Sequence, residues 1–325
     1  MAWRLRIAPE KTNFDFFAYQ KLTFGGSMAL TVVAMLLWAV MGLNFGIDFK
    51  GGTTIRTESS VAVDVGAYRA ALEGSDLGDV VITEVFDPSF RPDQHVAMVR
   101  IGAQEGDEAV TPETIAKVEA ALQGLDPAMK FPSVESVGAK VSGELVQSAI
   151  LAMVAASLGI MAYIWLRFEW QYAVGGVLAL IHDIFITIGV FALFQLKFDL
   201  SIIAALLTIL GYSINDTVVV FDRLRENLIK FKTMPLRDVM NLSVNETLSR
   251  TLMTSFTTII ALVAMMVYGG DVIRGFVFAI TFGVVLGTYS SVFVAKNFVL
   301  MFGLDRSDKP KTGKGADHEF ANVDA

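Results

Sequence analysis

Six apolar stretches, each of about 18 residues or more, dominate this chain, and a helix of that length can cross the hydrocarbon core of a bilayer. Hydrophobic residues make up 54% of the 325 residues, whereas soluble domains average about 45–50%. The excess is concentrated in these stretches, so we expect a polytopic α-helical membrane protein with six transmembrane helices. The expected spans are residues 24–43, 145–166, 172–194, 201–221, 251–268 and 272–299.

The first apolar stretch, residues 24–43, is longer than the apolar core of a signal peptide, which has about 7–15 residues. It therefore predicts an uncleaved first transmembrane helix after a basic N-terminus. A cleaved signal peptide is the alternative.

Residues 45–143 differ in kind from the rest of the chain. Between Asp48 and Lys140 there are sixteen acidic and eight basic side chains, a net charge of −8. Short alternating segments predict strands at 53–58, 79–87, 95–102 and 130–138 and helices at 63–74 and 111–124. This β-α-β-β-α-β order predicts an α+β domain of the ferredoxin-like type, outside the membrane.

Lysine and arginine are distributed asymmetrically around the spans. The N-terminus, the connector 223–237 and the C-terminal tail are basic and fall on one side, while the acidic domain falls on the other. The positive-inside rule then predicts that both termini are cytoplasmic and the domain periplasmic. The predicted division is 1–44 (cytoplasmic N-terminus and first span), 45–143 (periplasmic domain), 144–302 (five further spans) and 303–325 (disordered cytoplasmic tail).

Two opposite charges are expected inside the membrane. Asp216 lies about 24 Å from the outer end of its span, and Arg250 lies about 28 Å from the outer end of the next span. Adjacent antiparallel helices would place the two side chains at similar depth. Because an ionised carboxylate in lipid costs a few kcal/mol, Asp216 should face the bundle, find a partner or titrate.

The Asp216–Arg250 pair could have either of two roles. As a proton carrier, Asp216 would alternate between a charged state beside Arg250 and a neutral state away from it. As a static ion pair, it would fix helix packing. Hydroxyl side chains at three- and four-residue steps form a polar stripe beside Arg250 that could hold water: Thr247, Thr251, Thr254, Ser255 and Thr258.

Asp183 is a third candidate, about 16 Å from the inner end of its span and close to the midplane. Stepped in depth from Asp216, it could extend a proton path. The alternative is a neutral acid hydrogen-bonded to a neighbouring helix. His182 lies about 100° around the helix, so we expect it to be a packing or interfacial residue on another face.

Several kinds of chemistry are excluded or disfavoured. The chain has no cysteine and three scattered histidines, so thiol chemistry is excluded and a metal site is not expected. Gly51 and Gly52 precede no GK[ST] sequence, so they predict a tight turn rather than a nucleotide loop. Gly283 and Gly287 predict close helix packing. We expect no cofactor and no enzymatic activity.

Five motifs together resemble the SecF members of the SecD/SecF family, within the resistance-nodulation-division superfamily. They are "FGIDFKGGT", "VESVGAKVSGEL", "RFEW", "GYSINDTVVVFDRLREN" and "TLSRTLMTS". The resemblance runs from about Phe45 to Phe302, and Ala139 stands where the family pattern has proline.

The resemblance implies an accessory subunit of the Sec preprotein translocase in the bacterial inner membrane. The implied partners are SecD, the SecYEG channel, YajC, unfolded preproteins and the lipid bilayer, with no nucleic acid. The pair of SecD and SecF would use the proton motive force to drive or complete export. The family's two essential membrane positions fall on Asp216 and Arg250, with weaker support for Asp183.

Two other functions remain open at this point. The chain could be half of a proton-coupled transporter of small molecules or lipids, since other members of the superfamily transport such substrates. It could also be a scaffold of the translocation channel that moves no protons.

Overall fold

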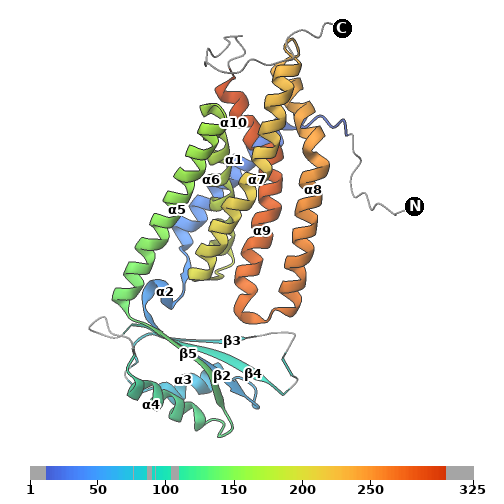
Figure 1. Cartoon of the computed structure of the whole chain (residues 1–325). Coiled ribbons are helices and arrows are strands. Elements are labelled where there is room, and N and C mark those ends of the chain that lie inside the picture. The colour runs from blue at the N-terminus through green and yellow to red at the C-terminus, as the bar shows by residue number, and fades with distance from the viewer. Residues whose placement is uncertain (1–11, 76, 86–89, 92, 104–109, 305–325) are drawn as a thin grey trace, which may run out of the picture.

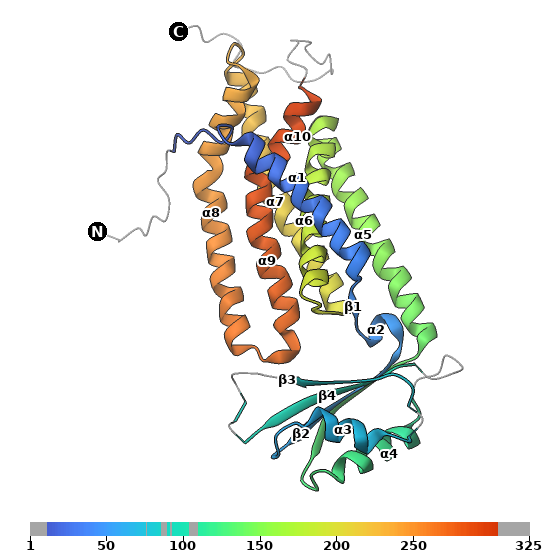
Figure 2. The ribbon, with the colours of Figure 1, turned by 180° about the vertical axis from the view of Figure 1, so that it is seen from behind.

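The computed structural model describes residues 12–75, 77–85, 90–91, 93–103 and 110–304. A helical bundle makes up most of the molecule, and a smaller domain of strands and helices sits at one end of it (Figures 1 and 2). Nearly all of the predicted tail, from residue 305, lies outside the described residues.

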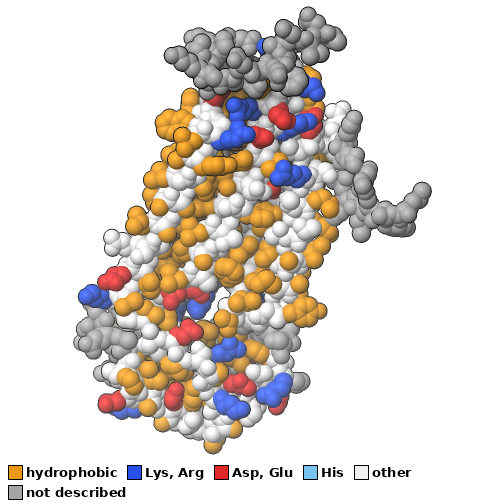
Figure 3. Space-filling view, viewed as in Figure 1, with side chains coloured by type: hydrophobic (Ala, Val, Ile, Leu, Met, Phe, Trp, Pro, Cys, Tyr) orange, Lys and Arg blue, Asp and Glu red, His pale blue; other side chains and the backbone are white. Residues whose placement is uncertain are grey.

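Six helical segments in the described chain are long and apolar enough to cross a membrane, which confirms the predicted six spans. Most charged side chains on the face in Figure 3 collect at the two ends of the bundle and on the domain, and hydrophobic side chains cover the height between. The helices are α1 (Gln20–Met41), α5 (Ala139–Arg167), α6 (Trp170–Leu193), α7 (Leu200–Lys230), α8 (Leu236–Tyr268), α9 (Asp271–Phe293) and α10 (Ala295–Phe302).

Helices α7 and α8 are longer than the apolar stretches that predicted them. Most of the basic connector 223–237 is helical, and only residues 231–235 separate the two helices. A helix satisfies its own backbone hydrogen bonds, so it can continue past the lipid into a polar environment. Pro235 precedes the first residue of α8, where its missing N–H costs nothing.

The last span is broken near its end. Val294 separates α9 from α10 with backbone angles of φ −105° and ψ −57°. The short α10 packs against α6 as well as α9. This break has no proline or glycine signal and was not predicted.

The domain contains a four-stranded antiparallel sheet with the strand order β3-β4-β2-β5. Helices α3 and α4 cover the face of the sheet that points away from the bundle (Figures 1 and 2). Each predicted element is present within two residues of its predicted bounds. The elements are β2 (Gly52–Ser59), α3 (Val65–Leu72), β3 (Val80–Val85), β4 (His95–Ile101), α4 (Pro112–Gln123) and β5 (Lys130–Val137).

The core of the domain lies between the sheet and its two helices. Ile55 and Val99 from the sheet pack with Tyr68 of α3 and Val118 of α4, all buried. Thr111 caps α4 by accepting a hydrogen bond from the backbone N–H of Thr114. The strands and helices predicted from the local sequence pattern therefore enclose one common core.

Two small elements between the bundle and the domain were not predicted. Strand β1 (Asn44–Phe45) pairs in parallel with β6 (Lys197–Phe198), which directly precedes α7. A single helical turn, α2 (Ile47–Lys50), follows β1 and leads into β2. Such a short parallel pair joins residues about 150 positions apart, so local sequence patterns carry no signal for it.

The segment before α1 crosses the first turns of α8, at the end of the bundle far from the domain. We name residues 12–17 the N-terminal strap. Asn245 of α8 accepts a hydrogen bond from the backbone N–H of Phe14 and donates one to its carbonyl oxygen. Asn241 makes the same two kinds of bond, to the N–H of Phe16 and the carbonyl of Phe14. The strap thus ties the start of the chain to the helix that carries Arg250.

Candidate functional site

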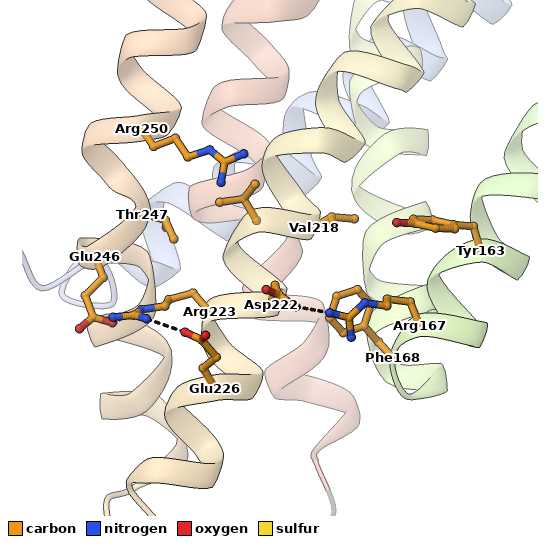
Figure 4. A pocket seen from close by; sticks show the side chains of 11 residues that line it. Tyr163, Arg167, Phe168, Val218, Asp222, Arg223, Glu226, Glu246, Thr247 and Arg250 are labelled. Carbon is orange, nitrogen blue, oxygen red and sulfur yellow. Dashed lines mark hydrogen bonds and ion pairs between the residues drawn. The ribbon is translucent and has the colours of Figure 1, made fainter. Parts of the chain in front are cut away.

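The two charges predicted inside the membrane lie on neighbouring helices. Asp216 is on α7 and is 3% exposed, and Arg250 is on α8, which packs against α7. Figure 4 shows Arg250 extending from α8 toward α7. The electrostatic neighbours of Asp216 are Arg250 and the side chain of Asn215.

Asp216 and Arg250 do not form a closed ion pair in the described chain, because no N–O distance within 4.0 Å joins them. The Oδ2 atom of Asp216 is buried and has no hydrogen-bond partner among the described residues. The same is true of the hydroxyl of Thr251, which follows Arg250 on α8. Buried polar atoms nearly always have hydrogen-bond partners, so each of these two atoms can take a further partner such as an ordered water.

Beyond Thr251, further hydroxyl groups lie toward the domain end of the bundle. Ser255, one turn beyond Thr251, shares a 2.6 Å hydrogen bond with Thr288 of α9. The hydroxyl of Tyr212, one turn before Asp216 on α7, donates to Ser255 at 3.4 Å and to Thr258 at 3.5 Å.

Not every member of the predicted polar stripe faces this network. Thr251 and Ser255 are buried, whereas the hydroxyls of Thr247 and Thr254 bond back to carbonyls on their own helix.

An open pocket of about 480 Å³ approaches Arg250 from the far end of the bundle. It lies between α5, α7 and α8, and Tyr163, Val218 and Arg250 are among its lining side chains (Figure 4). The other arginines that line the pocket are already paired: Arg167 bonds to Asp222 at 2.8 Å, and Arg223 contacts Glu226 and Glu246 at 2.5 and 2.7 Å. Among the three arginines that line the pocket, Arg250 is the one that forms no ion pair with a carboxylate of the described residues.

Asp183 of α6 lies in a separate cluster and is fully buried. Its Oδ2 atom accepts hydrogen bonds of 2.7 Å from Ser213 of α7 and of 2.7 Å from Ser290 of α9. The carboxyl group therefore joins three helices. It reaches the helix of Asp216 one turn away from that residue, rather than contacting Asp216 itself.

The expectation that His182 and Asp183 occupy separate faces is wrong. The Nδ1 atom of His182 lies 2.9 Å from Oδ1 of Asp183, and His182 is 2% exposed. Both side chains are buried, and the Nε2 atom of His182 has no hydrogen-bond partner among the described residues. His182 is thus part of the Asp183 cluster.

The predicted close packing at Gly283 and Gly287 is present, and it brings α9 onto α7. A Cβ atom on Gly283 would lie 2.3 Å from Ile209, and one on Gly287 would lie 2.9 Å from the Cβ of Ser213. Real Cβ contacts are essentially never this short. Glycine at these positions lets Ser213 and Ser290 converge on Asp183.

Sequence reasoning missed Lys296 of α10, which is 1% exposed. Its ammonium lies 4.1 Å from the ring centre of Phe17 and 5.1 Å from that of Phe16, and it donates a 3.2 Å hydrogen bond to the carbonyl oxygen of Phe16. It therefore binds the N-terminal strap from α10, in addition to the bonds that Asn241 and Asn245 make from α8. A lone lysine inside an apolar run was the available signal.

Comparison with known proteins places this chain in a family. The family model for the C-terminal part of protein export membrane proteins SecD/SecF matches residues 117–305, and the SecD/SecF GG motif matches residues 36–63. A protein from Cereibacter sphaeroides, described as Protein translocase subunit SecF, is 70% identical over 325 residues, which is 100% of both chains. The chain belongs to the SecD/SecF family.

Other proteins of the SecD/SecF family are also similar to this chain in sequence and in structure. Protein translocase subunit SecF of Rhodobacter capsulatus is 65% identical over 317 residues, covering 96% of this chain and 95% of the relative. Among solved structures, SecDF of Thermus thermophilus, described as a translocon-associated membrane protein, matches with a TM-score of 0.81 and 32% identity. That match covers 91% of this chain and 39% of the SecDF chain.

A second SecDF structure, described as the super-membrane-facing form, matches with a TM-score of 0.66 and 33% identity. It covers 92% of this chain and 39% of that chain. The chain therefore spans about two fifths of the length of the SecDF proteins it resembles. Asp183, Asp216 and Arg250 all lie within the region that the SecD/SecF family model matches.

Proposed function

We propose that this multi-pass membrane protein is an accessory subunit of the Sec translocase that, together with SecD, uses the proton motive force to drive or complete protein export across the inner membrane. The observation that carries the proposal is the buried, unpartnered carboxyl oxygen of Asp216 beside Arg250. A closed ion pair would favour the static reading. An open pair leaves a site that can accept and release a proton.

The polar groups around the pair support a path through the membrane. On one side the pocket of about 480 Å³ gives access to Arg250. On the other side the hydroxyls of Thr251, Ser255 and Tyr212 continue toward the domain. In this proposal Asp183 is the third proton-handling group, linked to the helix of Asp216 through Ser213.

The orientation and division of the chain are part of the proposal. Both termini are cytoplasmic, and the domain at 45–143 is periplasmic and ferredoxin-like. The divisions after 44, 143 and 302 lie near the end of α1 at Met41, the start of α5 at Ala139 and the end of α10 at Phe302. The basic far end of α7 supports the orientation, and the β3-β4-β2-β5 order supports the fold.

The proposed partners are SecD, the SecYEG channel, YajC and unfolded preproteins. The pairing with SecD rests on the match to 39% of SecDF chains. In this chain alone α5 and α8 are largely exposed, so a partner chain has helix faces to cover there.

Precursor accumulation in living cells tests the proposal. Replacing Asp216 by Asn keeps the shape of the side chain and removes its proton exchange, so unprocessed preproteins should accumulate. Asp222→Asn is the matched control, because Asp222 lies on the same helix but is half exposed and paired with Arg167. Normal export with Asp216→Asn would favour the scaffold function instead.

Co-purification tests the half-transporter alternative. If the proposal is right, the SecYEG channel and SecD copurify with the protein from mild detergent. Recovery of a small-molecule efflux partner without the channel would support transport of small molecules or lipids.

A further inference from the structure

The start of α7 is bonded to the segment that leads from α1 into the outer domain. Strand β1 pairs with β6 just before α7, with Asn44 opposite Lys197 and Phe45 opposite Phe198. The N–H of Gly46 donates a 2.8 Å hydrogen bond to the carbonyl of Phe198. The chain thus contacts β6, the strand just before α7, before it enters the domain.

Asp48, in α2, makes the next bond in the same direction. Its Oδ2 atom accepts a 3.0 Å hydrogen bond from the backbone N–H of Leu200, the first residue of α7. The first N–H groups of a helix have no partner within the helix, and a carboxylate there also meets the positive end of the helix dipole. Asp199 satisfies the next N–H, that of Ser201, so Asp48 supplies a cap that the helix does not supply itself.

The same residue contacts α5, the other helix that is continuous with the domain. The hydroxyl of Ser142, near the start of α5, donates a 2.8 Å hydrogen bond to the backbone carbonyl of Asp48. Asp48 therefore bonds to α7, and α5 bonds to Asp48. Both chain connections between the bundle and the domain contact this one residue.

The domain holds this segment from its own side. Arg100 of β4 donates a 2.8 Å hydrogen bond to the carbonyl of Phe45. Gly52, the first residue of β2, has φ +119°, and a Cβ there would lie 2.3 Å from the carbonyl oxygen of Ile101. The segment is therefore packed tightly against β4 at the point where it enters the sheet.

Aromatic rings fill the space between these bonds. The ring centres of Phe45 and Phe198 lie 5.9 Å apart, and those of Phe49 and Phe198 lie 5.7 Å apart. Residues from β1, α2 and β6 thus form one packed unit, which we name the junction (residues 44–50 and 197–200).

We propose that Asp48 is a positioning residue that couples α7 to the outer domain, and that the junction stays closed and moves with α7. The inference rests on the proposed function, because α7 is the helix of Asp216. Asp216 lies 16 residues after Leu200, or about 24 Å along a continuous helix. A rigid helix passes a tilt or shift at Asp216 to its capped end, where Asp48 and the paired strands pass it to the domain.

The chain has no cysteine, which allows a covalent test. Paired strands are about 4.8 Å apart, within the Cα separation of about 4.4–6.8 Å that a disulfide needs. Asn44→Cys with Lys197→Cys should therefore crosslink β1 to β6. In otherwise unchanged protein, the oxidised crosslink should leave gradient-driven export at the level of the reduced protein. Loss of export on oxidation would overturn the proposal, because it would mean that the junction must open.

The variants of Asp48 test the bond itself. Asp48→Ala removes the acceptor and should abolish most gradient-driven export, and the oxidised 44–197 crosslink should restore it. Asp48→Asn keeps an oxygen acceptor for Leu200 and should retain export. Wild-type export by Asp48→Ala, or no rescue by the crosslink, would contradict a coupling role.

A distance measurement gives a readout that a purely structural role would not change. Spin labels at Lys117 on the domain and Ile229 at the far end of α7, both exposed, should report a change in separation when a proton gradient is imposed. Asp48→Ala should lose this change while Asp48→Asn keeps it. An equal change in Asp48→Ala would overturn the proposal.

Asp216→Asn, measured in parallel, separates this inference from the proposed function. If Asp216→Asn exports normally, the proposed function fails. If Asp216→Asn fails to export while Asp48→Ala exports normally, the coupling inference alone is wrong.

Discussion

The hydroxyl of Ser213 on α7 donates a 2.7 Å hydrogen bond to Oδ2 of Asp183 on α6. Ser213 precedes Asp216 by three residues, about one helical turn. The two carboxylates that the sequence placed at different depths are therefore linked through one turn of one helix. Ser290 of α9 donates to the same oxygen with the same distance, so the chain contains its own control for this link.

Ser213→Ala and Ser290→Ala should have similar costs in stability but different effects on export. Each removes one hydrogen bond from Asp183, which inside a membrane protein costs about 0.6 kcal/mol and at most ~1.7 kcal/mol. Only Ser213 lies on the helix of Asp216, so Ser213→Ala should reduce gradient-driven export more. Thermal unfolding in detergent and export in vesicles measure the two effects. Equal export by both variants would mean that Asp183 only fixes helix packing.

Arg250→Ala should reduce gradient-driven export to the level seen without a gradient, while the protein still inserts normally. The guanidinium is the positive charge beside Asp216, and Arg250→Lys should retain part of the activity because it keeps the charge. Arg223→Ala is the matched control, since Arg223 lines the same pocket but is paired with Glu226 and Glu246. If Arg223→Ala and Arg250→Ala behave alike, the effect belongs to the pocket's charge and not to the pair.

Gly283→Ala should destabilise the bundle, because its Cβ would lie 2.3 Å from Ile209 on α7. Overpacking of this kind costs about 1–3 kcal/mol. Gly211→Ala is the control on α7 itself, where a Cβ meets nothing within 4 Å. Replacing that glycine should be neutral or stabilising by up to ~1 kcal/mol. A melting temperature that falls equally in both variants would contradict the close packing of α7 and α9.

The domain of strands and helices should lose part of its stability in acid, because of Asp126. A 2.6 Å hydrogen bond from the Ser59 hydroxyl, with further bonds from the N–H groups of Ala128 and Ser60, lowers the pKa of Asp126. Because the folded pKa lies below the unfolded value of about 3.9, this contribution is present above that value and is lost as the pH falls through the folded pKa.

Amide hydrogen exchange of β2 in the full-length protein measures this acid sensitivity. Protection should stay constant from neutral pH to about pH 5 and fall below about pH 4. Asp126→Asn keeps an acceptor that does not titrate, so its protection should fall less. The same acid response in both proteins would assign the effect to other carboxylates.

The periodic parts of the fold could be predicted from the sequence, and the contacts between distant segments could not. Apolar length predicted the six spans, and alternation predicted the strands of the domain, because both signals are local. Asp216 and Arg250 were found by counting depth along adjacent helices. The open geometry of the pair was not predictable, because it depends on side-chain positions within the packed bundle.

The contacts that were not predicted from the sequence also depend on how the chain folds. Asp48 bonds to Leu200 across about 150 residues, and the strap at Phe14 and Phe16 bonds to Asn245 and Lys296 across more than 200. Helical angles alone suggested that His182 points away from Asp183, but a 2.9 Å contact joins them. Pairing of this kind requires the tertiary structure.

Proton-linked export by membrane vesicles shows whether Asp216 exchanges the protons that drive export. The vesicles carry the wild-type protein, Asp216→Asn or Asp216→Glu, and preprotein transport is measured with and without an imposed proton gradient. We expect the gradient to stimulate export fully for the wild type, partly for Asp216→Glu and not for Asp216→Asn, with equal export by all three when no gradient is present. Full stimulation of Asp216→Asn by the gradient would contradict this expectation.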